Sequence, residues 1–237
     1  MKPFIYESKQ FQLELENETH MAGEVAFLRS IAKPGMNALD VGAHRGVTTV
    51  ALAKSVGPSG RVYAFEPVPE YCYAARENLS RNRADNAEVF ELALSDQKGR
   101  LRFHKREGSS GIVPGGSQEA LTVEATTIED FLVERNVYGI DLLSMDCEGS
   151  ELRVLQGARS LLQEQAPQVF CEIHHDFLAN LGQSAEDVVG VLEGLGYRVR
   201  PHSVETLDAE PSLEECSHIY ARKPDRSEAM RLKEKIA

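Results

Sequence analysis

The sequence predicts a doubly wound α/β domain whose mostly parallel sheet has seven strands and a hairpin-like insertion. Two observations favour this architecture. Short apolar runs alternate with segments of helical period along most of the chain, which is typical of a parallel sheet covered by helices. The chain has 237 residues, of which 42% are apolar, and this suffices for one sizeable core. We therefore expect one α/β domain with additions rather than several domains.

The individual elements follow from the period of the apolar residues. A lead-in helix over 20–32 comes first, with Thr19 as its N-cap. The expected strands of the sheet are 37–41, 61–65, 88–93, 140–145, 168–173, 197–199 and 217–221, the last of them antiparallel. The expected helices after the lead-in are 46–56, 69–82, 127–135, 149–163 and 184–195.

The pattern divides the chain into three parts. Residues 1–36 form the helical lead-in, 37–222 form the main domain, and 223–237 form a charged tail. Within the main domain, about residues 95–126 alternate with period two around a stretch rich in Gly and Ser, which indicates the insertion. Its tip, 104–118, is a candidate binding loop, although a mere connector is at least as common.

A turn rich in glycine follows the first predicted strand and carries the clearest functional signal. The strand ends in Asp40-Val41, and Gly42 and Gly46 lie before the next helix. Glycine lets the backbone approach a ligand closely. The second strand leads to Glu66, which is placed to accept hydrogen bonds from both hydroxyls of a ribose. Together these residues predict a nucleoside-binding crevice.

The same turn favours S-adenosylmethionine over a phosphate-bearing nucleotide. Both the dinucleotide fingerprint Gly-x-Gly-x-x-Gly and the Walker pattern with its Lys are missing. The acid Asp40 would repel a pyrophosphate, whereas it attracts the sulfonium and ammonium groups of S-adenosylmethionine. An ordinary glycine turn is the alternative, but an acid at each of two strand tips argues against it.

Acidic residues also follow the strand predicted at 140–145. Carboxyl ends of parallel strands meet at one edge of the sheet, so Asp146 should face the same crevice as Asp40 and Glu66. Glu148 is equally well explained as a helix cap or as an active-site group. For Glu151 the preferred explanation is that an acid in the first turn of a helix interacts favourably with the helix dipole.

The strand predicted at 168–173 ends in two histidines. His174 and His175 stand beside acids at the same edge of the sheet, so we expect one of them to line the substrate pocket. Cys147 and Cys171 are better explained as small core residues than as nucleophiles, because nothing marks either thiol as activated.

Composition excludes several classes of partner and compartment. The net charge of −11 and the lack of a basic, aromatic cluster argue against nucleic acid and anionic membranes. No window approaches 18 apolar residues, and the first residues lack the apolar core of a signal peptide. The four cysteines are scattered without a Cys-x-x-Cys pair, which favours reduced thiols, a cytoplasmic protein and no zinc site.

Seven short motifs occur in the order that characterises a known family. They are Leu39 to Gly46, Val62 to Pro67, Glu77 to Asn82, Leu92 to Asp96, Thr126 to Phe131, Met145 to Ala158 and Glu172 to His174. Over about residues 37–200 the chain resembles the FkbM-type S-adenosylmethionine-dependent methyltransferases. The resemblance implies a class I methyltransferase fold, which is Rossmann-like. It also implies methyl transfer, most often to a hydroxyl of a sugar or polyketide-like natural product and sometimes to nitrogen. His44-Arg45 and Ser144 depart from the usual family residues, which bears on the substrate class.

These inferences give each candidate residue a role. The expected cofactor-binding residues are Asp40, Gly42, Ala43, His44, Gly46, Glu66, Pro67, Leu92, Ala93 and Asp146. Asp40 supports the loop or binds the methionine ammonium. His174 is the leading general base, since a neutral imidazole accepts a proton near physiological pH; His175 is its alternative, and Asp146 lies near the reacting atoms. A less favoured alternative is a divalent metal bound by Asp146, Glu148, Glu172 and His174.

The predicted function is O-methylation of a small-molecule acceptor. N-methylation of a small molecule or peptide, or a non-catalytic nucleoside-binding module, are the alternatives. An NAD-linked or nucleotide-sugar enzyme is disfavoured by Asp40. The sequence leaves the identity of the acceptor, the need for a metal and the oligomeric state open.

Overall fold

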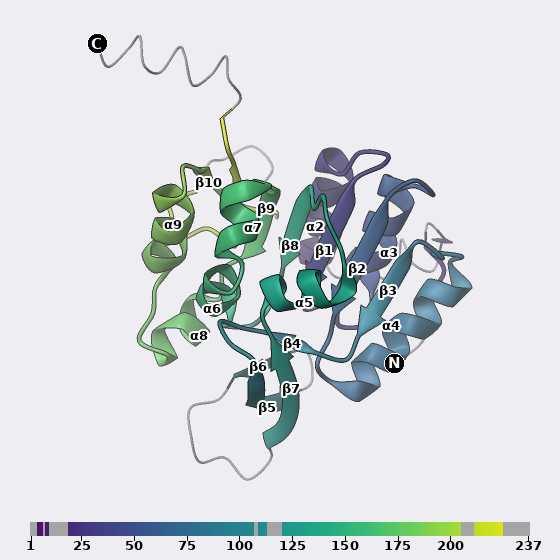
Figure 1. Cartoon of the computed structure of the whole chain (residues 1–237), viewed down its shortest axis with the longest axis horizontal. Helices are drawn as coiled ribbons and strands as arrows, with labels where there is room; N and C mark the ends of the chain where they lie inside the picture. The colour runs from purple at the N-terminus through teal and green to yellow at the C-terminus, as the bar shows by residue number, and fades with distance from the viewer. Residues whose placement is uncertain are drawn as a thin grey trace.

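The computed structural model describes residues 4–6, 8–9, 19–106, 109–112, 120–204 and 211–224 (Figure 1). The helices are α2 Thr19–Ile31, α3 Val47–Val56, α4 Pro69–Arg81, α5 Ile128–Arg135, α6 Glu151–Gln156, α7 Arg159–Glu164, α8 His175–Asn180 and α9 Ala185–Gly194. The strands are β1 Asn37–Val41, β2 Arg61–Phe65, β3 Ala87–Phe90, β4 Ala93–Leu94, β5 Gly99–Arg106, β6 Ser109–Ile112, β7 Ala120–Thr126, β8 Leu142–Met145, β9 Gln168–Glu172, β10 Arg198–His202 and β11 His218–Arg222.

Seven strands form the main sheet, in the order β10-β11-β9-β8-β1-β2-β3. Strand β11 pairs antiparallel with both of its neighbours, β10 and β9, whereas β9, β8, β1, β2 and β3 pair in parallel. The order reverses between β1 and β8, so the carboxyl ends of these two strands flank the crevice where ligands bind in such folds. The predicted fold class, including the antiparallel last strand, is confirmed.

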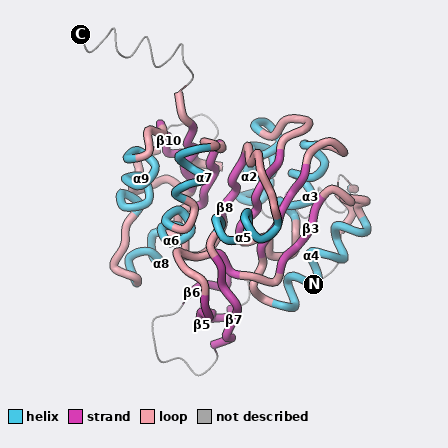
Figure 2. Tube along the Cα trace, in the orientation of Figure 1, coloured by secondary structure: helices cyan, strands magenta, loops and turns pink. Residues whose placement is uncertain are grey.

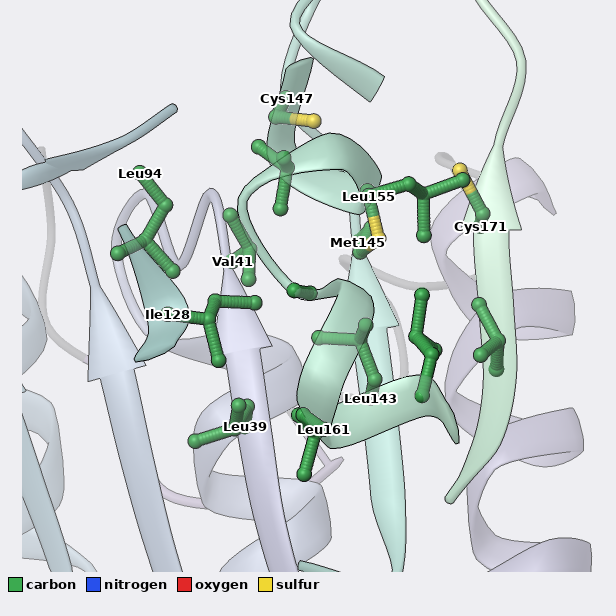
Figure 3. Close-up of a cluster of buried hydrophobic side chains, with 14 of the residues drawn as sticks. Leu39, Val41, Leu94, Ile128, Leu143, Met145, Cys147, Leu155, Leu161 and Cys171 are labelled. Atoms are coloured by element: carbon green, nitrogen blue, oxygen red, sulfur yellow. The ribbon is translucent and has the colours of Figure 1, made fainter. Parts of the chain in front are cut away.

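Helices cover both faces of the sheet and create two cores, as Figures 1 and 2 show. Residues that are adjacent in a strand point to opposite faces. Ala38 and Leu142 therefore pack with α2, α3 and α4, whereas Leu39 and Leu143 pack with α5, α6, α7 and α9. Figure 3 shows part of the second core, in which Leu39 lies near Leu161 and Leu155 lies near Met145.

The insertion forms a second sheet in the order β4-β7-β5-β6. Strands β5 and β7 pair antiparallel, as the period-two pattern predicts, and β6 extends the sheet into the predicted tip. The prediction of one strand over 88–93 is wrong in one respect. The strand ends at Phe90, and Ala93–Leu94 pairs with β7 instead, so the chain crosses from one sheet to the other at Glu91 and Leu92. Most of the tip, 107–108 and 113–119, lies outside the described residues, as does 225–237 of the tail.

Two helix predictions need correction. The helix expected at 149–163 is divided into α6 and α7 around Gly157. A Cβ at Gly157 would lie 2.1 Å from the carbonyl oxygen of Ser95, so the start of the insertion packs directly against this break. The short helix α8 was not predicted, because its six residues are too few to establish a period. No helix among the described residues is long and apolar enough to cross a membrane.

Gly42 allows the end of β1 to pass against the end of β8. Its φ is +88°, and its amide donates to the carbonyl oxygen of Phe65 at 2.9 Å. A Cβ at this position would lie 1.6 Å from the carbonyl oxygen of Asp146. Gly46, with φ +82°, likewise approaches Ala75. The expectation that these glycines serve close approach to a ligand is therefore incomplete, because the protein's own backbone already requires them.

We expect Gly42→Ala to destabilise the chain through this contact. Gly196→Ala is a matched control, because Gly196 has a similar φ of +84° but no described atom lies within 4 Å of the place that its Cβ would take. Both variants carry the left-handed strain of roughly 1–2 kcal/mol, and only Gly42→Ala adds overlap of about 1–3 kcal/mol. Urea unfolding should show the larger loss for Gly42→Ala; equal losses would contradict the role of the Asp146 contact.

Candidate active site

A cavity of about 530 Å³ lies at the carboxyl ends of β1, β2, β8 and β9. The turns that follow these strands supply most of its wall, α2 supplies a second part, and the insertion a third. The lining residues are Met21, Glu24, Val41, Gly42, Ala43, His44, Arg45, Val47, Thr48, Phe65, Glu66, Pro67, Tyr71, Leu92, Ala93, Leu94, Phe103, Asp146, Cys147, Glu148, Ser150, Glu172 and His174.

The cavity brings together most of the residues singled out in the sequence. Those that line it are Gly42, Ala43, His44, Glu66, Pro67, Leu92, Ala93, Asp146, Glu148, Glu172 and His174. Three candidates are not among the lining residues, namely Asp40, Gly46 and His175.

Glu66 connects the end of β2 to the turn after β1. Its Oε1 accepts the amide of Val68 at 2.7 Å, and its Oε2 accepts the amide of His44 at 2.8 Å. The side chain is 5% exposed, and burial raises its pKa to about 7 despite these two hydrogen bonds. Each carboxylate oxygen accepts more than one hydrogen bond, so Glu66 retains acceptor capacity toward the cavity. That is the chemistry needed for a pair of ribose hydroxyls.

Asp40 points away from the cavity, toward the start of α3. Its Oδ2 accepts the hydroxyls of Thr48 at 3.0 Å and Thr49 at 2.6 Å. Burial raises its pKa to about 6, against the opposing effect of these hydrogen bonds. Of the two roles considered for Asp40, this geometry favours support of the loop over contact with a bound ammonium group.

His174 stands at the centre of four carboxyl groups. Its Nδ1 lies 2.6 Å from Glu151 Oε1, and its Nε2 lies 3.4 Å from Asp146 Oδ1 and 3.6 Å from oxygens of Glu148 and Glu172. Burial lowers the pKa of His174, but the hydrogen bond to Glu151 and the surrounding negative charge outweigh burial and raise it to about 10. This raised pKa favours the protonated ring near pH 7 and so counts against a neutral imidazole base, and the catalytic role of His174 stays a prediction.

The acidic turn after β8 places Glu148 and Glu151 around this histidine. Glu148 has a φ of +49° and lines the cavity. Of the two explanations considered for Glu148, a helix cap or an active-site group, this position favours the second. Glu151 is the first residue of α6, as expected, but it is 0% exposed and also accepts the amide of Gly149 at 3.1 Å. An interaction with the helix dipole alone is therefore an incomplete account of Glu151, since it directly holds His174.

His175 does not reach the cavity. It begins α8, and its Nε2 lies 3.0 Å from the carbonyl oxygen of Cys216. His174 and His175 are adjacent in the sequence, but the turn after β9 directs their side chains to different places, and only His174 lines the cavity. Cys147 and Cys171 are buried, and burial raises the pKa of both thiols well above the usual value, which agrees with their expected place in the core.

Glu24 on α2 is the main pocket residue that the sequence analysis missed. It is 2% exposed and lines the cavity, and burial, with Asp146 and Glu172 nearby, raises its pKa well above the usual value. A signal was present, because Glu24 lies three residues after Met21 and four before Leu28 in the apolar stripe of this helix. A charged residue inside such a stripe indicates a functional position.

The residues that could hold a metal are a subset of those predicted. Among the described residues, Asp146, Glu148 and His174 each offer one ligand atom, and these atoms lie within 4.8 Å of one another. Glu172, the fourth candidate, is adjacent to His174 but stands outside this group.

Known proteins share this chain's sequence and fold. A family model described as the methyltransferase FkbM domain matches residues 40–199. The chain is 30% identical over 200 residues to the 31-O-demethyl-FK506 methyltransferase FkbM of Streptomyces tacrolimicus, covering 70% of this chain and 74% of that protein. It is 27% identical over 151 residues to the 2-O-methyltransferase NoeI of Sinorhizobium fredii, covering 56% of this chain and 61% of NoeI.

A solved structure shows the same fold. The crystal structure of a methyltransferase FkbM from Methylobacillus flagellatus aligns with a TM-score of 0.53 at 19% sequence identity. The alignment covers 79% of this chain and 43% of that one. The chain therefore spans less than two thirds of the length of NoeI and of this solved protein.

We expect the free energy of unfolding of the ligand-free chain to fall as the pH rises from about 4 to 7. A buried acid whose folded-state pKa is raised binds its proton more tightly in the folded than in the unfolded chain, so stability is lost as the pH rises through this window. For Asp40, with its folded pKa near 6, the loss is on the order of 3 kcal/mol. Thermal unfolding measured at several pH values should show the decline.

Asp40→Asn should make that decline shallower, since an amide oxygen still accepts from Thr48 and Thr49 but does not titrate. Glu193→Gln, at an exposed position on α9, is the control and should follow the parent chain. A decline as steep in Asp40→Asn as in the parent would show that Asp40 does not titrate in this range.

Proposed function

Because the chain belongs to the FkbM family of S-adenosylmethionine-dependent methyltransferases, we propose that it transfers a methyl group to a hydroxyl of a small molecule, such as a sugar or another natural product. The observation that carries this proposal is the continuous cavity that joins Glu66 to the carboxyl groups around His174. The names of two relatives support it, because FkbM of S. tacrolimicus and NoeI are both described as acting at oxygen.

The residues of the cavity fit the methyl donor. Glu66 offers acceptor capacity for the ribose hydroxyls, and Leu92, Ala93 and Phe65 offer an apolar wall for the adenine. The donor carries positive charge on its sulfonium and ammonium groups, which the carboxyl groups of Asp146 and Glu148 favour. When bound, the donor supplies an electrophilic methyl group.

The chain's own residues then align the acceptor and remove its proton. The acceptor oxygen gives an electron pair to the methyl carbon, and the pair of the carbon–sulfur bond returns to sulfur. Holding the two molecules in contact and in line accounts for much of the rate. The hydroxyl proton passes to a carboxylate of the cluster, since the raised pKa of His174 favours its protonated form. The role of His174 is then to position Asp146 and Glu148.

A nitrogen acceptor is the second candidate. Glu24, Asp146, Glu148 and Glu172 line one side of the cavity, and such a wall attracts an amine in its cationic form. An amine must lose a proton before it attacks, so the same carboxylates would serve. Incubation with methyl-labelled donor and matched pairs of hydroxyl and amine acceptors, followed by analysis of the labelled product, separates the two.

We also infer a reducing compartment, the cytoplasm, as the place of the reaction. All four cysteines are buried and free in the described structure. Unpaired thiols of this kind persist where the surroundings are reducing.

We expect Glu66→Ala to weaken S-adenosylmethionine binding by roughly ten- to a hundredfold, because hydrogen bonds to a charged acceptor contribute about 1.5–3 kcal/mol. Glu91→Ala is the matched control: it removes the same charge from an exposed position on the loop between β3 and β4, outside the cavity lining. Calorimetric titration of both variants measures the effect, and circular dichroism checks their folding.

In the same experiment the parent chain should bind S-adenosylmethionine and not NAD. Tight binding of NAD, or unchanged donor affinity in a well-folded Glu66→Ala variant, would remove the assigned role of Glu66.

A further inference from the structure

Carboxyl groups gather on the wall of the cavity formed by β8, β9 and α2. Those of Glu24, Asp146, Glu148 and Glu172 line it together with the imidazole ring of His174. Buried carboxylates are stable only when they are paired, protonated or bound to a metal. The wall therefore suits an additional cation.

The ligand atoms have the spacing of a metal site. His174 Nε2 lies 3.4 Å from Asp146 Oδ1 and 3.6 Å from Glu148 Oε2, distances longer than a well-formed hydrogen bond. Two ligands that are each ~2.1 Å from a metal ion lie ~3.4 Å apart in a tetrahedral site and ~3.0 Å apart in an octahedral one. All three ligand atoms lie within 4.8 Å of one another, so one ion placed between them could contact all three after adjustment of the side chains.

The other ring nitrogen of His174 is held as in known metal sites. Its Nδ1 lies 2.6 Å from Glu151 Oε1, and Glu151 is fully buried. Metal-binding histidines almost always donate their second N–H to a carboxylate or carbonyl, which orients the ring and makes the ligating nitrogen more basic. Glu151 is thus a positioning residue, and it aims Nε2 at Asp146 and Glu148.

A second observation points to a ligand at the same place. Ser150 lines the cavity and is 3% exposed, yet its hydroxyl oxygen has no hydrogen-bond partner among the described residues. Buried hydroxyls are normally paired with protein or water. Ser150 directly precedes Glu151 and follows the acidic turn, so a hydrated ion beside Glu148 would supply the missing partner.

We propose that Asp146, Glu148 and His174 bind a divalent cation of the Mn²⁺ class, which accepts both carboxylate oxygen and imidazole nitrogen. Three protein ligands leave open positions for water and for the acceptor. The second part of the proposal rests on the proposed function: the acceptor hydroxyl binds the ion, which makes its proton more acidic. The oxygen then takes the methyl group, the carbon–sulfur electron pair returns to sulfur, and the proton passes to Glu172 and on to water.

Manganese binding tests the site without any methyl transfer. The 237-residue chain is treated with chelator, dialysed and titrated with Mn²⁺ by electron paramagnetic resonance. We expect one strongly bound Mn²⁺ per chain, with nitrogen coupling from an imidazole. His174→Ala should abolish that coupling, whereas His175→Ala, the neighbouring histidine outside the cavity, should retain it.

Carboxyl variants complete the test. Glu148→Gln, on the turn, should weaken Mn²⁺ binding at least tenfold, and Glu151→Gln roughly ten- to a hundredfold through loss of ring orientation. Glu193→Gln should change nothing. Titrations with Mg²⁺ and Zn²⁺ in competition rank the ions. Absence of strong Mn²⁺ binding, or binding that is unaffected in Glu148→Gln and His174→Ala, overturns the site and leaves an ion-paired His174.

Donor titration on the same samples separates this proposal from the proposed function. S-adenosylmethionine binding by the metal-free chain without any Mn²⁺ site would overturn only the metal proposal. A Mn²⁺ site in a chain that does not bind S-adenosylmethionine would overturn the methyltransferase function and the acceptor activation that rests on it, and would leave the metal site itself standing.

Discussion

The close packing of the parallel strands β1 and β8 at their carboxyl ends is the constraint on which the site depends. The amide of Asp146 donates to the carbonyl oxygen of Val41 at 2.8 Å, and the carbonyl oxygen of Asp146 occupies the space that a side chain at Gly42 would need. The turn after β1 and Asp146 at the end of β8, both of which line the cavity, are therefore parts of one contact. Glu66 adds a second connection, because its carboxylate holds the amides of His44 and Val68. The turns after β1, β2 and β8, which line the cavity, are consequently held to one another by these contacts.

Charge is the second organising feature of the site. The sheet brings acids from separate strand ends, together with Glu24 from α2, into a space with little solvent. Burial, together with the neighbouring acids, raises the pKa of Glu24 and of Asp146, and the hydrogen bond to Glu151 and the surrounding acids raise that of His174. A proton on His174 and a metal ion are two ways to satisfy the same excess of negative charge. If a metal ion binds as proposed, His174 is a ligand; with a proton in its place, His174 is an ion-pair partner.

The strands and most pocket residues are predictable from sequence, because apolar period and strand-end position are local properties. Asp146, Glu66 and His174 all come from that argument. What sequence reasoning misses depends on contacts between distant segments. Ser95 packing against Gly157 divides one predicted helix, and pairing with β7 removes Ala93 from its predicted strand. The basicity of His174 likewise follows from carboxyl groups that only the folded chain brings together. His174 and His175 are neighbours in the sequence, and the conformation of the turn after β9 determines that His174 is the one that lines the cavity.

The small second sheet contributes to the cavity through Phe103, although it shares no strand with the main sheet. Its own core of Phe103, Val123 and Ala125 packs on Val68 and Tyr71. In the described part of the chain, none of its strands is hydrogen-bonded into the seven-stranded sheet. Substitutions on this sheet can therefore reshape one wall of the cavity at little cost to the structure that carries Glu66 and Asp146. The part of the fold that shapes this wall is thus distinct from the part that positions the two carboxylates.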